Sequence, residues 1–282
     1  MNEYLPWPAI HSDVEWILNA PSLLTRSEEL WQMPVPENID YSIIWQNLET
    51  ITSRRSGKLG LYFETLVHAM FMAHPRFELL ANNIIIRHNG RTLGEVDLLL
   101  QDLETDEVIH LELALKFYLG LTGPGEPATR FIGAGLHDFL HRKLHRLYHH
   151  QLVLPNIAKQ VNGWPDHLPF PDKHRLWIPG RLYLPEGIEF KSMAGAVPDT
   201  PWRLNPKCEV SYWITAEDKA LPKGAKPLQK AAWLSGHDSP GKANIRLPAQ
   251  FILPDSKLPV YVLPTGWHTQ ALQKIKAYQQ SL

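Results

Sequence analysis

The stretch that decides the fold reads Gly94-Glu95-Val96-Asp97-Leu98-Leu99-Leu100, then a polar connection, then His110-Leu111-Glu112-Leu113-Ala114-Leu115-Lys116. Both halves are rich in Leu and carry isolated charges, a composition typical of two strands in a largely buried sheet. The connection, residues 102–107, is mostly polar and short enough for a hairpin. The sequence therefore predicts two antiparallel strands joined by a tight turn.

The position of the turn predicts which residues of the two strands lie opposite each other. A turn centred between Glu104 and Thr105 sets Asp97 directly opposite Glu112, because both are equally far from that centre. Side chains directly opposite on one face have β-carbons roughly 4.5–5.5 Å apart. Two carboxylates at that distance repel each other unless a proton or a cation lies between them.

The same register predicts that one face of the hairpin collects charged residues. Glu95 falls opposite Ala114, and the alternation of side chains places Glu95, Asp97, Glu112 and Lys116 on one face. Carboxylate oxygens suit hard cations such as Mg²⁺ or Mn²⁺, and a lysine beside them can stabilise charge on a phosphate. The alternative is an exposed strand face whose Glu and Lys side chains are merely solvated.

Four pieces of the sequence carry a resemblance to known proteins. They are Gly60-x-x-x-Glu64, Gly94-Glu95-x-Asp97, Glu112-x-Ala114-x-Lys116-Phe117-Tyr118-Leu119 and Lys143-Leu144-x-Arg146-Leu147-x-x-His150-Gln151-Leu152. With these motifs the chain resembles the PD-(D/E)XK nuclease superfamily and, more closely, a bacterial family known only as domain of unknown function 1853. The similarity runs along most of the chain, and its specific motifs occupy residues 57–152.

The resemblance implies a fold, a cofactor and a set of functional residues. The fold is α/β: a restriction-endonuclease-like core, in which helices flank a mixed sheet, with an N-terminal helical cover and a β-rich C-terminal region. Asp97 and Glu112 would hold Mg²⁺ or Mn²⁺ with help from Glu64, while Lys116 and Gln151 would complete the catalytic set. Lys143 and Arg146 would contact the substrate.

Two departures from the nuclease pattern bear on catalysis. Val96 rather than proline precedes Asp97. The usual Glu-x-Lys would put lysine at position 114, where this chain has Ala114, and Lys116 lies one pleat repeat further, about 6–7 Å along an unbroken strand.

We therefore expect a metal-dependent nuclease that hydrolyses phosphodiester bonds, with DNA a more probable substrate than RNA. The first alternative is a nuclease-fold module that binds nucleic acid without cleaving it. The second is a protein-interaction module that uses the tryptophan-rich C-terminal region.

The composition limits the choice of partners and cell compartment. The 282 residues carry a formal net charge of −1, so a nucleic acid would have to bind a local basic patch. The single cysteine, Cys208, excludes an internal disulfide and a cysteine-based zinc site. Residues 1–18 lack the pattern of a signal peptide, and no apolar run approaches the ~20 residues that span a membrane. We expect a cytoplasmic protein that does not enter the membrane.

Three contiguous regions follow from the pattern along the chain: a helical cover at 1–55, the nuclease-like core at 56–155 and a Pro- and Trp-rich, β-containing region at 156–282. In the cover, Ser12-Asp13-x-Glu15 predicts the start of a helix and residues 43–51 a second one. The core begins with an amphipathic helix at 58–73, entered from Gly57. Asn89-Gly90 then predicts a hairpin turn, which gives three consecutive antiparallel strands.

Residues 136–152 form the next predicted helix, with an apolar side facing the sheet. On it His137, His141, His145 and His149 repeat every fourth residue. Such a ladder either chelates zinc or nickel or is an exposed polar stripe.

The C-terminal region reads as short strands followed by one helix. Strands are predicted at 175–178, 180–184, 210–214, 251–253 and 260–263, and a helix at 269–280. Six tryptophans are spread among these elements. Their side chains either stack on nucleic-acid bases or fill a small β core.

Overall fold

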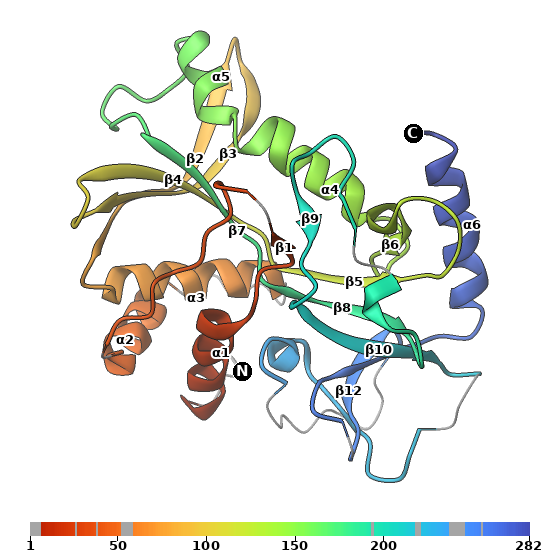
Figure 1. The fold of residues 1–282 in the computed structure, drawn as a ribbon. Coiled ribbons are helices and arrows are strands. Elements are labelled where there is room, and N and C mark those ends of the chain that lie inside the picture. The colour runs from red at the N-terminus through yellow and green to blue at the C-terminus, as the bar shows by residue number, and fades with distance from the viewer. Residues whose placement is uncertain are drawn as a thin grey trace. The chain divides into compact units, whose positions relative to one another are not determined.

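The computed structural model describes residues 7–25, 27–37, 39–51, 59–192, 195–217, 221–236, 246–254 and 256–282. It is an α/β protein that divides into two compact units, each assembled from separate stretches of chain (Figure 1). The hairpin unit comprises Ser27–Leu115 and His145–Ile178, and the seven-stranded unit comprises Met1–Arg26, Lys116–Leu144 and Pro179–Leu282. The division of the sequence into three contiguous regions, with boundaries at residues 55 and 155, rests on composition and stays a prediction.

The hairpin unit contains a four-stranded sheet in the order β2-β3-β4-β7. Its strands are β2 (Phe77–His88), β3 (Arg91–Asp102), β4 (Glu107–Leu113) and β7 (Lys173–Trp177). β2, β3 and β4 pair antiparallel in sequence order, as predicted, and β7 adds parallel to β4. The sheet is therefore mixed.

Turn chemistry explains both hairpins of this sheet. Asn89 and Gly90 have positive φ angles of 48° and 74°, which a type I′ turn requires. At the turn between β3 and β4, the Arg76 guanidinium donates hydrogen bonds to both carboxylate oxygens of Asp102, at 2.9 and 2.7 Å. Asp102 also accepts a hydrogen bond from the backbone N–H of Glu104 at 3.0 Å. Hydrogen bonding to Arg76 holds the pKa of Asp102 below its usual range. These hydrogen bonds stabilise the turn at the predicted position.

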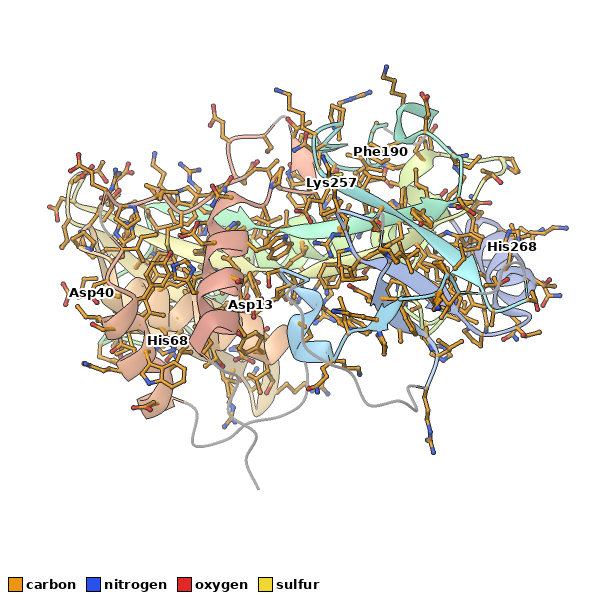
Figure 2. All side chains as sticks on the ribbon, turned by 90° about the horizontal axis from the view of Figure 1, so that it is seen from below. Asp13, Asp40, His68, Phe190, Lys257 and His268 are labelled. Carbon is orange, nitrogen blue, oxygen red and sulfur yellow. The ribbon has the colours of Figure 1, made fainter. Side chains whose placement is uncertain are left out.

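Two helices precede the sheet, α2 (Tyr41–Ile51) and α3 (Leu59–Ala73). α2 starts two residues before the predicted helix because Asp40 caps it, accepting the backbone N–H groups of Ser42 at 2.9 Å and Ile43 at 3.3 Å (Figure 2). α3 packs on β2 and matches the predicted helix, although Gly57 and Lys58 lie outside the described residues.

The predicted helix at 136–152 is wrong as a single element. α4 (Leu140–Arg146) begins only at Leu140, since Leu136 has a left-handed φ of 63° that a helix does not tolerate. A π-turn, η3 (Leu147–Gln151), follows, closed by the N–H of Leu152 on the carbonyl of Leu147 at 3.0 Å. A further helix, α5 (Leu154–Gln160), follows where no element was predicted. Pro155 is compatible with it, because it falls in the first turn, where its missing N–H is not needed.

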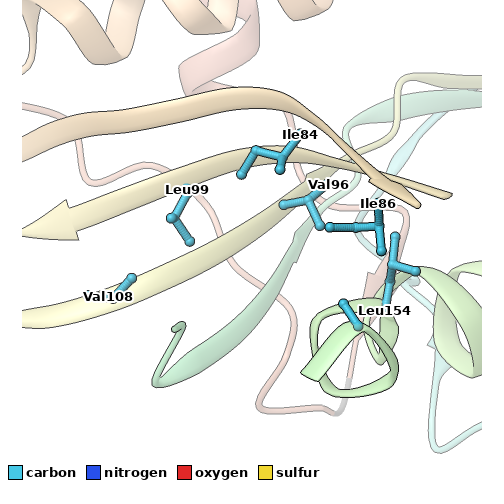
Figure 3. Packing of buried hydrophobic residues seen from close by; sticks show 7 residues of the cluster. Ile84, Ile86, Val96, Leu99, Val108 and Leu154 are labelled. Atoms are coloured by element: carbon cyan, nitrogen blue, oxygen red, sulfur yellow. The ribbon is translucent and has the colours of Figure 1, made fainter. Parts of the chain in front are cut away.

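α5 packs on β2 and β3 and closes one apolar cluster of the hairpin unit. Figure 3 shows Leu154 beside Ile86 and Val96. Leu154, Ile86 and Val96 are all fully buried. This packing fixes the start of α5, and with it the preceding π-turn, against β3, the strand that carries Asp97.

The seven-stranded unit holds the second sheet, in the order β11-β12-β13-β10-β8-β5-β6. Its strands are β5 (Lys116–Gly120), β6 (Phe131–Ile132), β8 (Gly180–Pro185), β10 (Glu209–Thr215), β11 (Lys226–Pro227), β12 (Ala249–Ile252) and β13 (Val260–Leu263). Four adjacent strands of this sheet run parallel, in the order β13, β10, β8 and β5. The predicted short strands of the C-terminal region are thus confirmed, and so is the final helix, α6 (Trp267–Gln279).

Two short strands and α1 complete this unit. β1 (Leu24–Thr25) pairs with β9 (Arg203–Leu204), and α1 spans Trp7–Asn19. The predicted helix start at Ser12 is wrong, because Asp13 lies inside α1 and is fully buried (Figure 2). Its Oδ1 accepts the hydroxyl of Ser235 at 2.6 Å, so this carboxylate holds a distant segment and does not cap a helix.

Tryptophan side chains serve as core residues in both units. Five of the six predicted C-terminal tryptophans are buried, namely Trp177, Trp202, Trp213, Trp233 and Trp267. Burial of this kind supports the core interpretation and removes these five rings as a stacking surface for bases. No helix in the described ranges is both long and apolar enough to cross a membrane.

Candidate functional site

Asp97 lies in the hairpin unit at the point where the β3–β4 ladder ends. The five ladder pairs run from Asp102↔Glu107 to Leu98↔Leu111, which confirms the predicted centre of the turn. The next pair in that register is Asp97 with Glu112, and there the backbone pairing stops. The Oδ2 of Asp97 instead accepts the backbone N–H of Leu113 at 2.8 Å.

This hydrogen bond shows how the two strands separate. The N–H of Ala114 points to β7, where it binds the carbonyl of Trp177 at 3.0 Å, so the N–H of Leu113 points toward β3. The Asp97 carboxylate takes the place of the carbonyl that a continued ladder would supply. Asp97 is half-buried and lies next to Glu112 in register.

Glu112 is a buried carboxylate with a donor at each oxygen. Its side chain is 2% exposed. The Nε2 of His110, two residues earlier on β4, lies 2.9 Å from Oε1, and the amide nitrogen of Gln151 donates to Oε2 at 3.2 Å. An ionised carboxylate has four lone-pair positions and can accept hydrogen bonds at both oxygens.

A second histidine extends the contacts of His110. The Nδ1 of His110 lies 3.1 Å from the Nδ1 of His174 on β7, and the Nε2 of His174 lies 3.3 Å from the amide nitrogen of Asn156 on α5. The pairing of β4 with β7 sets His110 and His174 side by side in parallel register. The four residues therefore form a continuous polar chain from α5 to Glu112.

Burial determines the charge of these two histidines. Desolvation lowers the pKa of His110 to about 3, because its side chain has no exposed surface on which an imidazolium could be hydrated. Burial also lowers the pKa of His174 to about 4, with smaller contributions from His110 and Arg175. Both rings are neutral at pH 7, so His110 binds Glu112 through a hydrogen bond and not through an ion pair.

The π-turn η3 delivers Gln151 to this cluster. Single π-turns inside helices are frequent at functional sites, because they change which side chains face a neighbour. Gln151 also donates to the backbone carbonyl of Glu95 at 3.3 Å, and its Oε1 lies 3.0 Å from the Nδ1 of His150. Gln151 thus bridges β3 and β4 beyond the end of their ladder.

Gly94 allows the π-turn and α5 to approach β3 this closely. A β-carbon at this position would lie 2.8 Å from the Cδ2 of Leu154 and 3.3 Å from the Cε1 of His150. Both distances are shorter than ordinary van der Waals contact. The glycine of the Gly-Glu-x-Asp motif therefore has a packing role in this chain.

The structure brings only some of the predicted site residues together. Gln151 contacts Glu112, and Asp97 is next to Glu112 in register, while half-buried Glu64 on α3 and exposed Arg146 at the end of α4 belong to the same hairpin unit. The prediction that Lys116 shares a strand face with Glu112 is wrong. β4 ends at Leu113, and Lys116 begins β5 in the seven-stranded unit, because the strand is interrupted at residues 114–115.

The substrate-binding pair is also divided. Lys143 belongs to the seven-stranded unit and Arg146 to the hairpin unit, since the boundary between the units falls within α4. Ala114, at the position of the usual lysine, is buried. The two halves of this helix therefore support different parts of the protein.

The histidine ladder does not form as predicted. His137 precedes α4, and His141 is 4% exposed with its Nδ1 2.9 Å from the hydroxyl of Tyr278. Only His145 and His149 stay together on the surface, with ring centroids 4.3 Å apart. The start of α4 at Leu140 and the π-turn break the four-residue repeat.

The residues present fit a cation that needs few protein ligands. Among the described residues, no three His, Cys, Asp or Glu side chains are arranged as a metal-binding group. Zinc and calcium sites use more protein ligands than two carboxylates provide, whereas Mg²⁺ keeps several waters and binds through one or two carboxylates and substrate phosphates. Asp97 and Glu112 match that last donor set.

Sequence reasoning missed the histidines and the asparagine that contact this cluster. His110 carries a local signal, because it is a polar residue two positions before Glu112 in an otherwise apolar strand and so shares its face. His174 and Asn156 carry none, since only the pairing of β4 with β7 and the packing of α5 bring them near. His150 appears in the sequence motif, but its contact with Gln151 depends on the π-turn.

Comparison with known proteins identifies a family. A family model described as "Domain of unknown function (DUF1853)" matches residues 12–251, most of the chain, so the chain belongs to this family. No curated protein and no solved structure matches it.

Proposed function

We propose that this member of the DUF1853 family is a metal-dependent nuclease of the PD-(D/E)XK kind, acting on phosphodiester bonds in nucleic acid, with DNA preferred over RNA. The observation that carries the proposal is the adjacency in register of Asp97 and Glu112 where the β3–β4 ladder stops, with Gln151 donating to Glu112. A mixed sheet with helices packed on it is in keeping with a restriction-endonuclease-like core.

In this proposal Asp97 and Glu112 hold Mg²⁺ or Mn²⁺, and Glu64 assists directly or through a water. When bound, such a cation would polarise the phosphate and lower the pKa of a coordinated water. Gln151 restrains Glu112 and the Glu95 carbonyl, so that the two strand ends keep their separation. Arg146, which belongs to the same unit as the two carboxylates, binds a flanking phosphate.

The test combines metal binding with cleavage. Calorimetry with Mn²⁺ should show binding by the parent and a loss of at least tenfold in affinity in Asp97→Asn and in Glu112→Gln. Glu78→Gln is the matched control, because Glu78 is an exposed residue of the same sheet. Equal Mn²⁺ affinity in the parent and in Asp97→Asn would remove the proposal.

Cleavage is assayed on single-stranded, duplex and branched nucleic acids with Mg²⁺ or Mn²⁺. Loss of cleavage in Asp97→Asn and in Glu112→Gln, with the activity of the parent retained in Glu78→Gln, would support hydrolysis at these two carboxylates. Cleavage that is unchanged in Asp97→Asn would remove the catalytic role of this residue.

A specific observation favours a second function, a nuclease-fold module that binds nucleic acid or a protein without cleaving it. The buried Ala114 occupies the usual lysine position, and Lys116 lies in the other compact unit. Such a module needs no water-activating lysine. Tight binding of nucleic acid by the parent, with no cleavage of any substrate, would favour this function over hydrolysis.

A further inference from the structure

Three side chains without a role in the proposed function form a path of successive contacts that ends at Glu112. Asn156 on α5 contacts His174 on β7, His174 contacts His110 on β4, and His110 contacts Glu112, at 3.3, 3.1 and 2.9 Å. The solvent exposure decreases along this path, from exposed Asn156 through half-buried His174 to His110 and Glu112, which are buried. The path therefore joins the protein surface to a buried carboxylate.

The contact between the two histidines restricts where their protons lie. Two facing Nδ1 atoms at 3.1 Å form a hydrogen bond only if one carries a proton and the other does not. In a neutral ring the second nitrogen then has the opposite role. For two neutral rings, both N–H groups consequently point the same way along the path, either toward Glu112 or away from it.

The contact on the other side of Glu112 fits the direction toward Glu112. The backbone carbonyl of Glu95 can only accept, so the nitrogen of the Gln151 amide is the atom that faces Glu95 and Glu112. Glu112 thus already serves as an acceptor at Oε2. A path directed toward Glu112 makes it an acceptor at both oxygens, as an ionised carboxylate is.

We propose that Asn156, His174 and His110 form a one-directional series of hydrogen bonds that holds Glu112 as a carboxylate in a fixed orientation. Asn156 donates to Nε2 of His174, Nδ1–H of His174 donates to Nδ1 of His110, and Nε2–H of His110 donates to Oε1. The three are positioning residues, and the part of this inference that concerns the cation rests on the proposed function.

The physical effect is to restrict the side chain of Glu112 before a cation binds. A glutamate loses rotamer freedom when it binds a metal, and this loss of conformational entropy is smaller for a carboxylate whose orientation is already fixed. Partners that orient a metal ligand in this way typically change metal affinity by about 10- to 100-fold when they are removed.

The first test reads the protons directly and needs no metal. Nitrogen-15 NMR of histidine-labelled protein at pH 7 separates the two neutral tautomers and the imidazolium, and the variants below assign the signals. We expect the Nε2–H tautomer for His110 and the Nδ1–H tautomer for His174. The reverse tautomers, or an imidazolium at His110, would overturn the proposal.

The second test removes one member of the series. His174→Phe fills the space of the ring but cannot donate, so the His110 signal should shift. His174→Gln keeps a donor and an acceptor and should restore the parent signal. His68→Phe is the matched control, because His68 is also a half-buried histidine, and its Nδ1 lies 3.0 Å from the amide nitrogen of Asn82, outside the series.

Asn156→Ala keeps the proposal testable if His174→Phe does not fold. Asn156 is exposed, so its removal should be tolerated, and it should shift the Nε2 signal of His174. An unchanged His174 signal in a folded Asn156→Ala protein would contradict the series.

The third measurement tests the positioning role. Mn²⁺ affinity should fall about tenfold in His174→Phe, return to within about threefold of the parent in His174→Gln, and stay unchanged in His68→Phe. Equal affinity in the parent and folded His174→Phe would overturn the positioning role. If the parent binds no Mn²⁺, the proposed function fails, and the tautomers alone decide whether the series exists.

Discussion

The backbone N–H of Leu113 donates to the Oδ2 of Asp97 at 2.8 Å, one step beyond the last ladder pair of β3 and β4. A side chain of β3 thereby accepts a hydrogen bond from a backbone N–H of β4, at the point where the two strands separate. Asp97 consequently has a structural role in addition to the one we propose for it in cation binding, and the two roles can be separated by choice of substitution.

Asp97→Ala and Asp97→Asn should differ in stability but not in metal binding. Alanine leaves the N–H of buried Leu113 without this acceptor and should cost about 1–3 kcal/mol in the free energy of unfolding. Asparagine keeps an acceptor oxygen and should cost less. Both should lose Mn²⁺ binding, since both lose the charge. Denaturant unfolding and calorimetry measure the two effects, and equal stability of both variants would contradict the structural role.

Gly94→Ala should destabilise the protein, whereas Gly60→Ala should not. The added methyl group at position 94 would lie 2.8 Å from the fully buried Leu154, and we expect a cost of about 1–3 kcal/mol from overpacking. Gly60 is the control, because it lies in α3 with nothing within 4 Å of an added β-carbon, and alanine there should stabilise the helix by up to about 1 kcal/mol. Thermal unfolding of both variants is the measurement, and a neutral Gly94→Ala would contradict the close approach of α5.

Stability should fall as the pH decreases from about 6.5 toward 4, partly because of His174. In the folded protein burial lowers its pKa from 6.5 to about 4, so in this range the unfolded chain binds a proton that the folded protein does not. The unfolded state is therefore favoured by acid, by at most about 1.4 kcal/mol per pH unit for each such group. Above pH 6.5 neither state is protonated and the effect is absent.

His174→Gln removes one of these groups and should flatten the decrease in stability between pH 6.5 and 4.5. His88→Gln is the control, since that residue lies at the end of β2, apart from the cluster. Urea unfolding at several pH values gives the comparison. A parent and a His174→Gln variant with parallel pH profiles would contradict the lowered pKa.

Reversing the charge of Arg146 should weaken nucleic-acid binding if the surface of α4 follows a phosphate backbone. Arg146→Glu should lower affinity for all sequences alike and reduce the slope of log affinity against log salt by about 1. Lys143→Glu is measured separately, because Lys143 belongs to the other compact unit. Arg91→Glu, which changes an exposed residue at the start of β3 and outside α4, is the control. An unchanged salt slope in Arg146→Glu would move the binding surface elsewhere.

Local features of the sequence were sufficient for the hairpins and for part of the site. The polar connection at residues 102–107 and the Asn89-Gly90 pair specify their turns through backbone conformations that few residues adopt. Once the centre of a turn is set, the antiparallel register follows by counting, which is why Asp97 and Glu112 could be placed next to each other. The motif spacing likewise indicated Gln151, although not the π-turn that presents it.

The sequence by itself thus determined the antiparallel strands, the turn centres and the adjacency of two carboxylates, because these depend on residues close in the chain. Only the tertiary structure decided that β4 stops at Leu113, that Lys116 starts a strand in another unit, and that His174 reaches His110 across 64 residues. Such outcomes depend on which strands pair in parallel and on where a helix packs. Those choices are made by the burial of side chains from distant segments, and no local pattern of residues encodes them.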